Sequence, residues 1–174
     1  MNDSGFFQAF IEYVSKNYVK ILTATGEHIY ISAIALAITL ITCIPLGIYL
    51  THNEKIAPYV ISVANVFQTI PSLALLGFLI FILGIGNDNA ICALYMYAML
   101  PVLQNTYTGI KNVNPSTVQA AKGMGMTKFQ ILRKVQIPLA LPVIISGVRV
   151  ATVWIIGTAS LAAAIGGGGL GKLI

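Results

Sequence analysis

Charged side chains are scarce in this sequence. Asp, Glu, Lys and Arg together make up 9% of its 174 residues, against roughly 25% in an average soluble globular domain. Apolar residues account for 57%, and the mean hydropathy is +0.85. So little charge cannot coat a water-facing surface. The composition therefore excludes an ordinary soluble domain and predicts a single-domain integral membrane protein.

Acidic residues are the scarcest charged group. Five Asp and Glu stand against ten Lys and Arg, and no acidic residue follows Asp88. Proton-coupled carriers usually place Asp, Glu or His inside their spans, so this absence counts against a secondary transporter. The basic residues are too few and too dispersed for a nucleic-acid surface, and in a membrane protein they mark cytoplasmic loops.

Residues that commonly carry chemistry are also rare. The two cysteines, Cys43 and Cys92, stand in apolar runs with no CxxC spacing and no nearby histidine, as packing residues do. The two histidines, His28 and His52, flank opposite ends of one apolar run and cannot meet. Without a nucleophile–base pair or a cluster of metal ligands, we expect neither an enzyme nor a metal site.

Long apolar runs are what the sequence does have. About 20 apolar residues suffice to cross the bilayer as a helix, and three runs fit a single crossing, at 29–50, 90–110 and 138–164. A fourth run, 56–87, is too long for one straight helix and too short for two, and a break near Pro71 would explain its length. We therefore predict an all-α, polytopic transmembrane bundle of about four to five membrane helices, the second one broken.

The N-terminal part differs from these runs. Residues 6–22 repeat apolar side chains at helical spacing, with charged residues elsewhere on the helical wheel. A helix lying in the membrane interface and a helix packed against the other spans both fit this pattern. We therefore expect residues 1–28 to form an amphipathic, interfacial segment and residues 29–174 to form the transmembrane domain.

Charge placement gives the orientation. The segment 111–137 holds half of all Lys and Arg residues and no acidic residue, so the positive-inside rule predicts that it is cytoplasmic. Counting spans from there places the 51–55 loop inside. The 87–89 loop, the N-terminus and the glycine-rich C-terminal end lie outside by the same count.

Helix signals recur within this cytoplasmic loop. Asn114 and Pro115 suit the start of a short helix, and Gly125 can end it. Thr127 and Gln130 form a capping-box pattern that starts a second helix. Apolar Phe129, Leu132 and Val135 are expected to share one face of that helix, surrounded by basic residues. Such a loop suits docking to a cytoplasmic partner, although a plain basic connector that attracts lipid headgroups is the alternative.

The loop also resembles a known family, the permeases of binding-protein-dependent ABC importers. Their loop has Glu-Ala-Ala, three residues, Gly, nine residues and Ile-x-Leu-Pro. The matching positions here are Gln119, Ala120, Ala121, Gly125, Val135, Ile137 and Pro138. Val135 and Ile137 are conservative departures, whereas Gln119 replaces the family's Glu and removes a charge that could pair with the ATPase.

Further strings, at 26–32, 68–74 and 159–171, are similar to the glycine betaine/carnitine/choline branch, and the resemblance covers about residues 26–174. It implies a bacterial, multi-pass permease of the cytoplasmic membrane that carries a small quaternary-ammonium or betaine-type solute. It also implies three protein partners: a cytoplasmic ATPase that holds ATP and magnesium, a second permease copy or paralogue, and an extracytoplasmic binding protein. No cofactor is implied on this chain. Relatives of this branch continue into a further span after the glycine-rich segment, so we expect this chain to lack the usual last span.

A phosphate-binding loop is suggested by Gly166 to Lys172, which fits the start of GxxxxGK[ST]. Leu173 follows in place of Ser or Thr, and a membrane span rather than a strand precedes it. We therefore expect no ATPase on this chain. A non-transporting scaffold that docks through 111–137, and an ion-coupled carrier that uses backbone carbonyls, remain the alternatives.

Two residues of the last span are candidates for the translocation pathway. Arg149 lies about 11 residues into it, near the midplane, where a charge is expensive and usually faces protein or water. It could meet a substrate carboxylate, pair with a partner subunit or set packing. Trp154, the only Trp, could hold a quaternary ammonium by cation–π attraction or simply face lipid or pack.

The broken second span offers the other pathway candidates: Asn65, Gln68 and Thr69, beside Pro71. Freed backbone at a broken membrane helix is tolerated where it meets protein or a cavity. Polar side chains in spans also hydrogen-bond between helices without touching substrate.

Overall fold

The computed structural model describes residues 3–173, and over this range the chain is helical with no strand. Its helices are α1 (Asp3–His52), α2 (Ala57–Thr69), α3 (Ser72–Leu83), α4 (Asn87–Lys111), α5 (Pro115–Gly123), α6 (Lys128–Ile131) and α7 (Ile137–Ala159). A π-helical turn (Leu132–Gln136) joins α6 to α7, and two 3-10 turns (Ser160–Ile165 and Leu170–Leu173) follow α7. The expected all-α architecture is confirmed.

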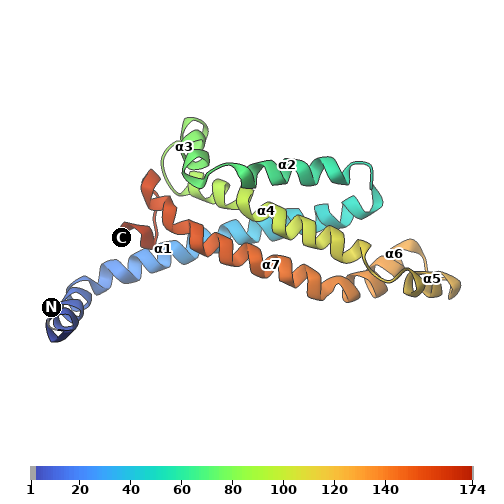
Figure 1. The fold of residues 1–174 in the computed structure, drawn as a ribbon, viewed down its shortest axis with the longest axis horizontal. Helices are drawn as coiled ribbons and strands as arrows, with labels where there is room; N and C mark the ends of the chain where they lie inside the picture. Colours follow the sequence, from blue (N-terminus) through green and yellow to red (C-terminus); the bar gives the residue numbers. More distant parts are fainter. Residues whose placement is uncertain (1–2, 174) are drawn as a thin grey trace.

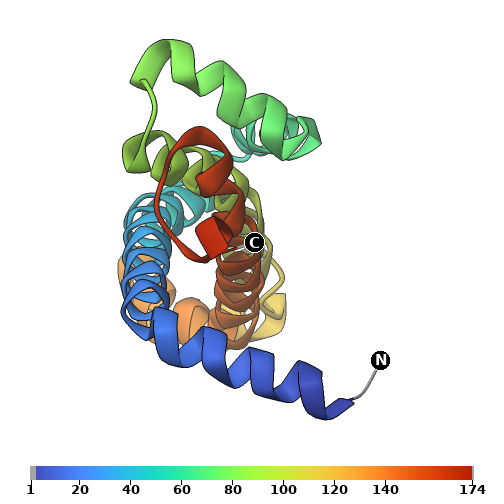
Figure 2. The same ribbon diagram turned by 90° about the vertical axis from the view of Figure 1, so that its left-hand side faces the viewer.

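Helices α1, α4 and α7 run side by side along the length of an elongated bundle (Figure 1). Helix α4 is central, because it packs against both α1 and α7 and also carries α2 and α3. Twelve of its 25 residues are buried. The short helices α5 and α6 form one end of the bundle, and the glycine-rich C-terminal segment covers the other (Figures 1 and 2).

Two helical stretches are long and apolar enough to cross a membrane, Ile11–His52 and Lys128–Ile165. Helices α2 and α3 qualify as a pair, bent by 103°, which gives up to three spans by length and composition. Helix α4 is about 37 Å long at 1.5 Å per residue, enough for the hydrocarbon core. Its neighbours cover it, so its side chains need not be as apolar as those of a lipid-facing helix.

The break in the second apolar run falls where the sequence predicts it. Helix α2 ends at Thr69, Ile70 is extended (ψ 130°), and Pro71 precedes the first residue of α3. Proline has no N–H for helical bonding and disfavours a helical conformation in the residue before it. The sharp turn between α2 and α3 follows from these two constraints.

Helix α1 has no boundary at residue 28. It is one helix of 50 residues, about 75 Å long, and its N-terminal part extends beyond the rest of the bundle (Figure 1). Ile11, Val19 and Leu22 are exposed there. The interfacial assignment of residues 1–28 stays a prediction.

Glycines permit the closest helix contacts in the bundle. A Cβ on Gly147 of α7 would lie 2.6 Å from both the Pro101 carbonyl oxygen and the Asn105 Cβ of α4. A Cβ on Gly47 of α1 would lie 2.8 Å from the Thr106 Cβ, also on α4. Small residues at such crossings let membrane helices approach closely, and dispersion contacts then hold them together. Both outer helices thus meet α4 at a glycine.

Candidate coupling loop and translocation face

The loop between α4 and α7 contains two helix N-caps, one at the start of α5 and one at the start of α6. The Asn114 side chain accepts a hydrogen bond from the Ser116 N–H at 2.9 Å, and Pro115 occupies the first position of α5. At the start of α6, the Thr127 hydroxyl accepts from the Gln130 N–H at 3.3 Å, while the Gln130 side chain accepts from the Thr127 N–H at 2.9 Å. Both predicted caps, including the reciprocal capping box, are confirmed.

Between these helices the chain reverses at Gly125. Its φ is +80°, a left-handed conformation that glycine adopts without steric cost. Nothing lies within 4 Å of where its Cβ would be, so its surface is open. On either side of Gly125, Met124 is 75% exposed and Phe129 is 68% exposed. Two large apolar side chains are therefore exposed close to the turn at Gly125.

The residues of the family pattern divide between two sides of the loop. Gln119, Ala120 and Gly125 are exposed, whereas Ala121 is buried. The partly buried Ile137 packs on a small apolar cluster formed by Ile110, Val113, Leu132, Ala140 and Ile144. The pattern therefore combines an open outer surface with an anchor that fixes the loop to the ends of α4 and α7.

The prediction that three apolar residues share one exposed face of the second loop helix is wrong. Phe129 is exposed, but Leu132 is buried in the anchoring cluster and Val135 is partly buried. The π-helical turn that begins at Leu132 changes the 3.6-residue spacing between Leu132 and Val135, whereas Phe129 and Leu132 lie at the border between the exposed and the buried side of α6. Met124 joins Phe129 on the exposed surface instead, and helical spacing within α6 gave no signal for it.

The 51–55 turn lies beside this loop, as the span count requires. Lys111 at the end of α4 forms a 3.3 Å ion pair with Glu54, and it donates a 3.1 Å hydrogen bond to the Tyr107 hydroxyl. Chiefly the bond to Tyr107, and then the bond to Glu54, raise the pKa of Lys111 above its ordinary value. Lys111 is therefore charged at neutral pH, and its side chain ties α4 to the α1–α2 turn.

Hydrogen bonds hold the break between α2 and α3 against α4. The Gln68 side-chain amide donates to the Tyr97 carbonyl oxygen at 2.9 Å, and the Tyr97 hydroxyl donates to the Ile70 carbonyl oxygen. Thr69 bonds to the Val66 carbonyl of its own helix at 2.7 Å. Gln68 thus serves the helix–helix role that the sequence left open, while Asn65 is exposed on α2.

Sequence reasoning missed Tyr97 and Asn89, both on α4. The fully buried Asn89 donates to the carbonyl oxygens of Leu76 (3.3 Å) and Gly84 (2.9 Å), so it braces α3 on α4. In the sequence Asn89 belongs to an Asn-Asp-Asn turn signal, and Tyr97 is one of several tyrosines in its region. Neither pattern distinguishes a residue that bonds to a distant backbone carbonyl.

We expect Tyr97→Phe to lower the melting temperature of the detergent-solubilised protein by a few degrees, because it removes one interhelical hydrogen bond, worth on average about 0.6 kcal/mol and at most about 1.7. Tyr59→Phe on the exposed face of α2 is the matched control and should melt like the parent. Equal melting temperatures for all three proteins would show that the Tyr97 bond does not hold the break in place.

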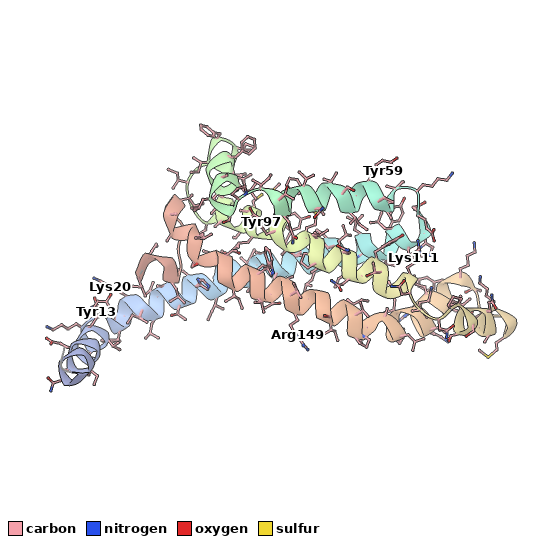
Figure 3. All side chains as sticks on the ribbon, viewed as in Figure 1. Tyr13, Lys20, Tyr59, Tyr97, Lys111 and Arg149 are labelled. Atoms are coloured by element: carbon pink, nitrogen blue, oxygen red, sulfur yellow. The ribbon has the colours of Figure 1, made fainter. Side chains whose placement is uncertain are left out.

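The structure does not bring the pathway candidates together within one chain. Gln68 and Pro71 belong to the α2–α3 side of α4, whereas Arg149 and Trp154 are on α7, which packs on α4 elsewhere. Arg149 is exposed and points away from the bundle (Figure 3). Trp154 is 44% exposed. The α7 surface therefore presents a charge and an indole to whatever surrounds this chain.

Within residues 3–173 no group of three or more His, Cys, Asp and Glu could hold a metal ion. Taken together, a bundle of apolar helices, a broken span and an exposed helical loop at one end are the features of a polytopic helical membrane protein. A model of the family described as the binding-protein-dependent transport system inner membrane component matches residues 43–174. The chain belongs to this family.

Curated relatives of known transport systems agree with this assignment. The chain is 49% identical over 162 residues to the glycine betaine/carnitine/choline transport system permease protein OpuCB of Bacillus subtilis, covering 93% of this chain and 75% of that protein. It is 38% identical over 169 residues to the osmoprotectant import permease protein OsmW of Salmonella typhimurium, covering 94% and 79%.

Solved structures give the same fold. The chain matches inward-facing conformations of the MetNI methionine ABC transporter with a TM-score of 0.76 and 25% sequence identity, over 88% of this chain and 77% of the other. Members of the family are permease subunits, and a separate subunit hydrolyses ATP. The chain is therefore a bacterial inner-membrane protein and not an enzyme, and its family carries no cofactor on this subunit.

Proposed function

We propose that this chain is the membrane-spanning subunit of an ATP-driven importer for a small quaternary-ammonium or betaine-type osmoprotectant. The observation that carries the proposal is the loop at 111–137, an anchored pair of helices that exposes Met124 and Phe129 around the left-handed Gly125. The substrate class is supported by the curated relatives, whose names specify glycine betaine, carnitine and choline.

The coupling step uses the anchored loop as a rigid connection. A cytoplasmic ATPase, which binds ATP and magnesium, would seat α5 and the adjoining Gly125 turn in a groove. The loop packs on Ile110 and Ile144, close to the ends of α4 and α7. A displacement of α5 is therefore transmitted to both helices, and their movement opens one side of the membrane while closing the other.

A second permease, copy or paralogue, would cover the outward surface of α7. Arg149 is exposed there near the middle of the span, and an arginine at the centre of a lipid-facing helix costs about 2.5–3.5 kcal/mol on insertion scales. A protein surface or an aqueous pathway between two permeases removes that cost. Arg149 and Trp154 then lie where two permeases meet, and an extracytoplasmic binding protein would deliver substrate to the other end.

Reconstitution tests the function. The permease, co-expressed ATPase and binding protein are placed in liposomes, and uptake of radiolabelled choline, carnitine and glycine betaine is measured with and without internal ATP. We expect uptake of at least one of them that requires ATP and the binding protein. Uptake driven by an ion gradient without ATP would favour the secondary carrier, and ATPase binding without any uptake would favour the scaffold.

Arg149→Leu should reduce the association of permeases. It removes a charge from the α7 surface and leaves any partner charge buried and unpaired, which costs about 3–5 kcal/mol. We expect co-purification of two differently tagged permeases to fall at least tenfold. Arg133→Leu in the cytoplasmic loop, also exposed, is the control for loss of a positive charge. Unchanged pairing in Arg149→Leu would exclude α7 as the contact between permeases.

A further inference from the structure

A glycine-rich segment, residues 166–171, lies across the end of the bundle opposite the coupling loop (Figure 2). Three of its neighbouring backbone N–H groups donate to side chains from distant helices. Gly169 donates to the Glu27 carboxylate at 3.1 Å, Leu170 to His28 Nδ1 at 3.4 Å, and Gly168 to Asn87 Oδ1 at 2.7 Å. Helices α1 and α4 thus hold the segment by its backbone.

His28 joins three elements with one ring. It is only 7% exposed, and its Nε2 lies 3.1 Å from the Ile156 carbonyl oxygen on α7. A carbonyl oxygen only accepts, so Nε2 carries the hydrogen and Nδ1 is the acceptor for Leu170. The ring therefore connects α1 both to α7 and to the glycine-rich segment.

Lys172 adds a charged contact to the same carboxylate. Its ammonium group lies 3.1 Å from Glu27 Oε2, the oxygen that also accepts from Gly169. Both side chains are partly exposed, so water screens the pair and its net stabilisation is small. A contact of this kind can form and break during each cycle of a transporter.

The glycines are needed for the close approach. A Cβ on Gly168 would lie 2.5 Å from Glu27 Oε2, and Gly169 has a φ of +106°. A Cβ on Gly171 would overlap the Ser160 carbonyl oxygen. These N–H groups, which a phosphate-binding loop would offer to a nucleotide, are instead satisfied by Glu27, His28 and Asn87.

We propose that Glu27, His28 and Asn87 form a clamp that closes the outer end of the permease by holding the glycine-rich segment, and that outward opening requires the clamp to release. The three residues are positioning residues for transport. The inference rests on the proposed function for its place in the transport cycle. It is supported by the likeness to inward-facing conformations of a methionine ABC transporter.

Cross-linking tests whether the clamp opens. In a protein whose native thiols are removed by Cys43→Ala and Cys92→Ala, Thr23→Cys and Lys172→Cys place a thiol pair across the clamp and leave Glu27, His28 and Asn87 in place. Both positions line one surface pocket between α1 and the C-terminal 3-10 turn, and a short, reducible bifunctional reagent can join them. The complete reconstituted complex is compared without nucleotide and trapped with ATP and vanadate. We expect cross-linking at least fivefold slower in the trapped state, and loss of uptake on cross-linking that reduction restores.

A second pair controls for reagent access. Glu12 and Lys16 form a 2.6 Å ion pair within one turn of α1, and Glu12→Cys with Lys16→Cys should cross-link equally in both nucleotide states. If the parent transports but the 23–172 pair cross-links at the same rate in both states, the clamp is wrong while the proposed function stands. Transport that persists after complete cross-linking would also overturn it.

A glycine substitution tests the clamp without transport. Gly168→Ala adds a Cβ that would lie 2.5 Å from Glu27 Oε2 and 3.0 Å from Glu27 Cβ, so it pushes the glycine-rich segment away from α1. We expect it to lower the yield of the 23–172 cross-link at least threefold in nucleotide-free permease. Gly26→Ala, where no atom lies within 4 Å of the added Cβ, should leave the yield unchanged. Equal yields in both variants would overturn the clamp even for a permease that shows no uptake.

Discussion

Gly125→Asp should abolish co-purification of the ATPase and reduce ATP-driven uptake at least a hundredfold, while the permease itself remains folded. Gly125 is exposed and has a φ of +80°. Because its Cβ position is open, an aspartate meets no steric barrier within this chain. The cost falls on the contact with the partner, where the new carboxylate must be desolvated beside the apolar Met124 and Phe129.

Two smaller substitutions separate charge from backbone strain. A non-glycine residue in a left-handed conformation costs of order 1–3 kcal/mol, and Asn is among the side chains that tolerate it best. Gly125→Asn therefore reproduces the shape of Asp without the charge, and we expect it to retain most of the ATPase. Gly125→Ala should fall between the two variants.

The measurement is affinity purification of the tagged permease from detergent with a co-expressed ATPase, followed by quantification of the ATPase per permease. Size-exclusion chromatography of each variant checks that it is folded. If Gly125→Asp recovers as much ATPase as the parent, the 111–137 loop is not the docking element. The scaffold and importer hypotheses would then both lose the observation on which they depend.

Features governed by neighbouring residues were predictable from the sequence. The Asn114 cap and the Thr127–Gln130 capping box each depend on atoms two or three residues apart, and the break at Pro71 follows from the geometry of proline itself. The broad architecture was predictable for a similar reason, since backbone polar groups in lipid have to be satisfied within a helix.

Features that depend on distant pairing were not predictable. Glu27 and Gly169 are 142 residues apart in sequence, and a charged residue before a span gives no sign of its partner. Gln68 and Arg149 both stood out as polar residues in apolar runs, but only the arrangement of helices around α4 shows that one braces a break and the other faces outward. Phe129 is exposed and Leu132 is buried although they are three residues apart in ordinary helical spacing, and the π-helical turn that begins at Leu132 shifts only the residues after it.

The N-terminal part of α1 shows a third limit on what could be predicted from the sequence. Charged residues before residue 29 led us to predict an interfacial segment over residues 1–28, which stays a prediction, but no residue indicated that α1 continues through Gly26 as one helix. A glycine weakens a helix interior by only about 1 kcal/mol relative to alanine. The apolar span that follows can support the preceding turns, because helix propagation is easier than a new start.

Gly147→Leu should prevent recovery of a folded, monodisperse permease. A Cβ at this position would already lie 2.6 Å from the Pro101 carbonyl oxygen and from the Asn105 Cβ, and leucine adds three further carbon atoms in the same direction. The obstacle includes backbone of α4, which is enclosed by its neighbours and cannot move aside locally. Overpacking of a close contact typically costs about 1–3 kcal/mol and occasionally more, and a clash with central backbone belongs to the upper end.

Gly157→Leu on the same helix is the matched control. Gly157 is exposed, and no atom lies within 4 Å of where its Cβ would be, so the same substitution adds apolar surface without a clash. We expect it to purify with the yield and elution profile of the parent, whereas Gly147→Leu should fall to less than a tenth of the parental yield in fluorescence-detected size-exclusion chromatography. Gly147→Ala should be intermediate.

The comparison also tests the proposed coupling. If α4 and α7 transmit the movement of the loop because they are in close contact at Gly147, any Gly147→Ala protein that folds should hydrolyse ATP with its bound ATPase but transport less substrate per ATP than the parent. Equal yields and equal coupling for the Gly147 and Gly157 variants would mean that α4 and α7 do not approach as closely as described. The assignment of α4 as the central helix of the bundle would then be wrong.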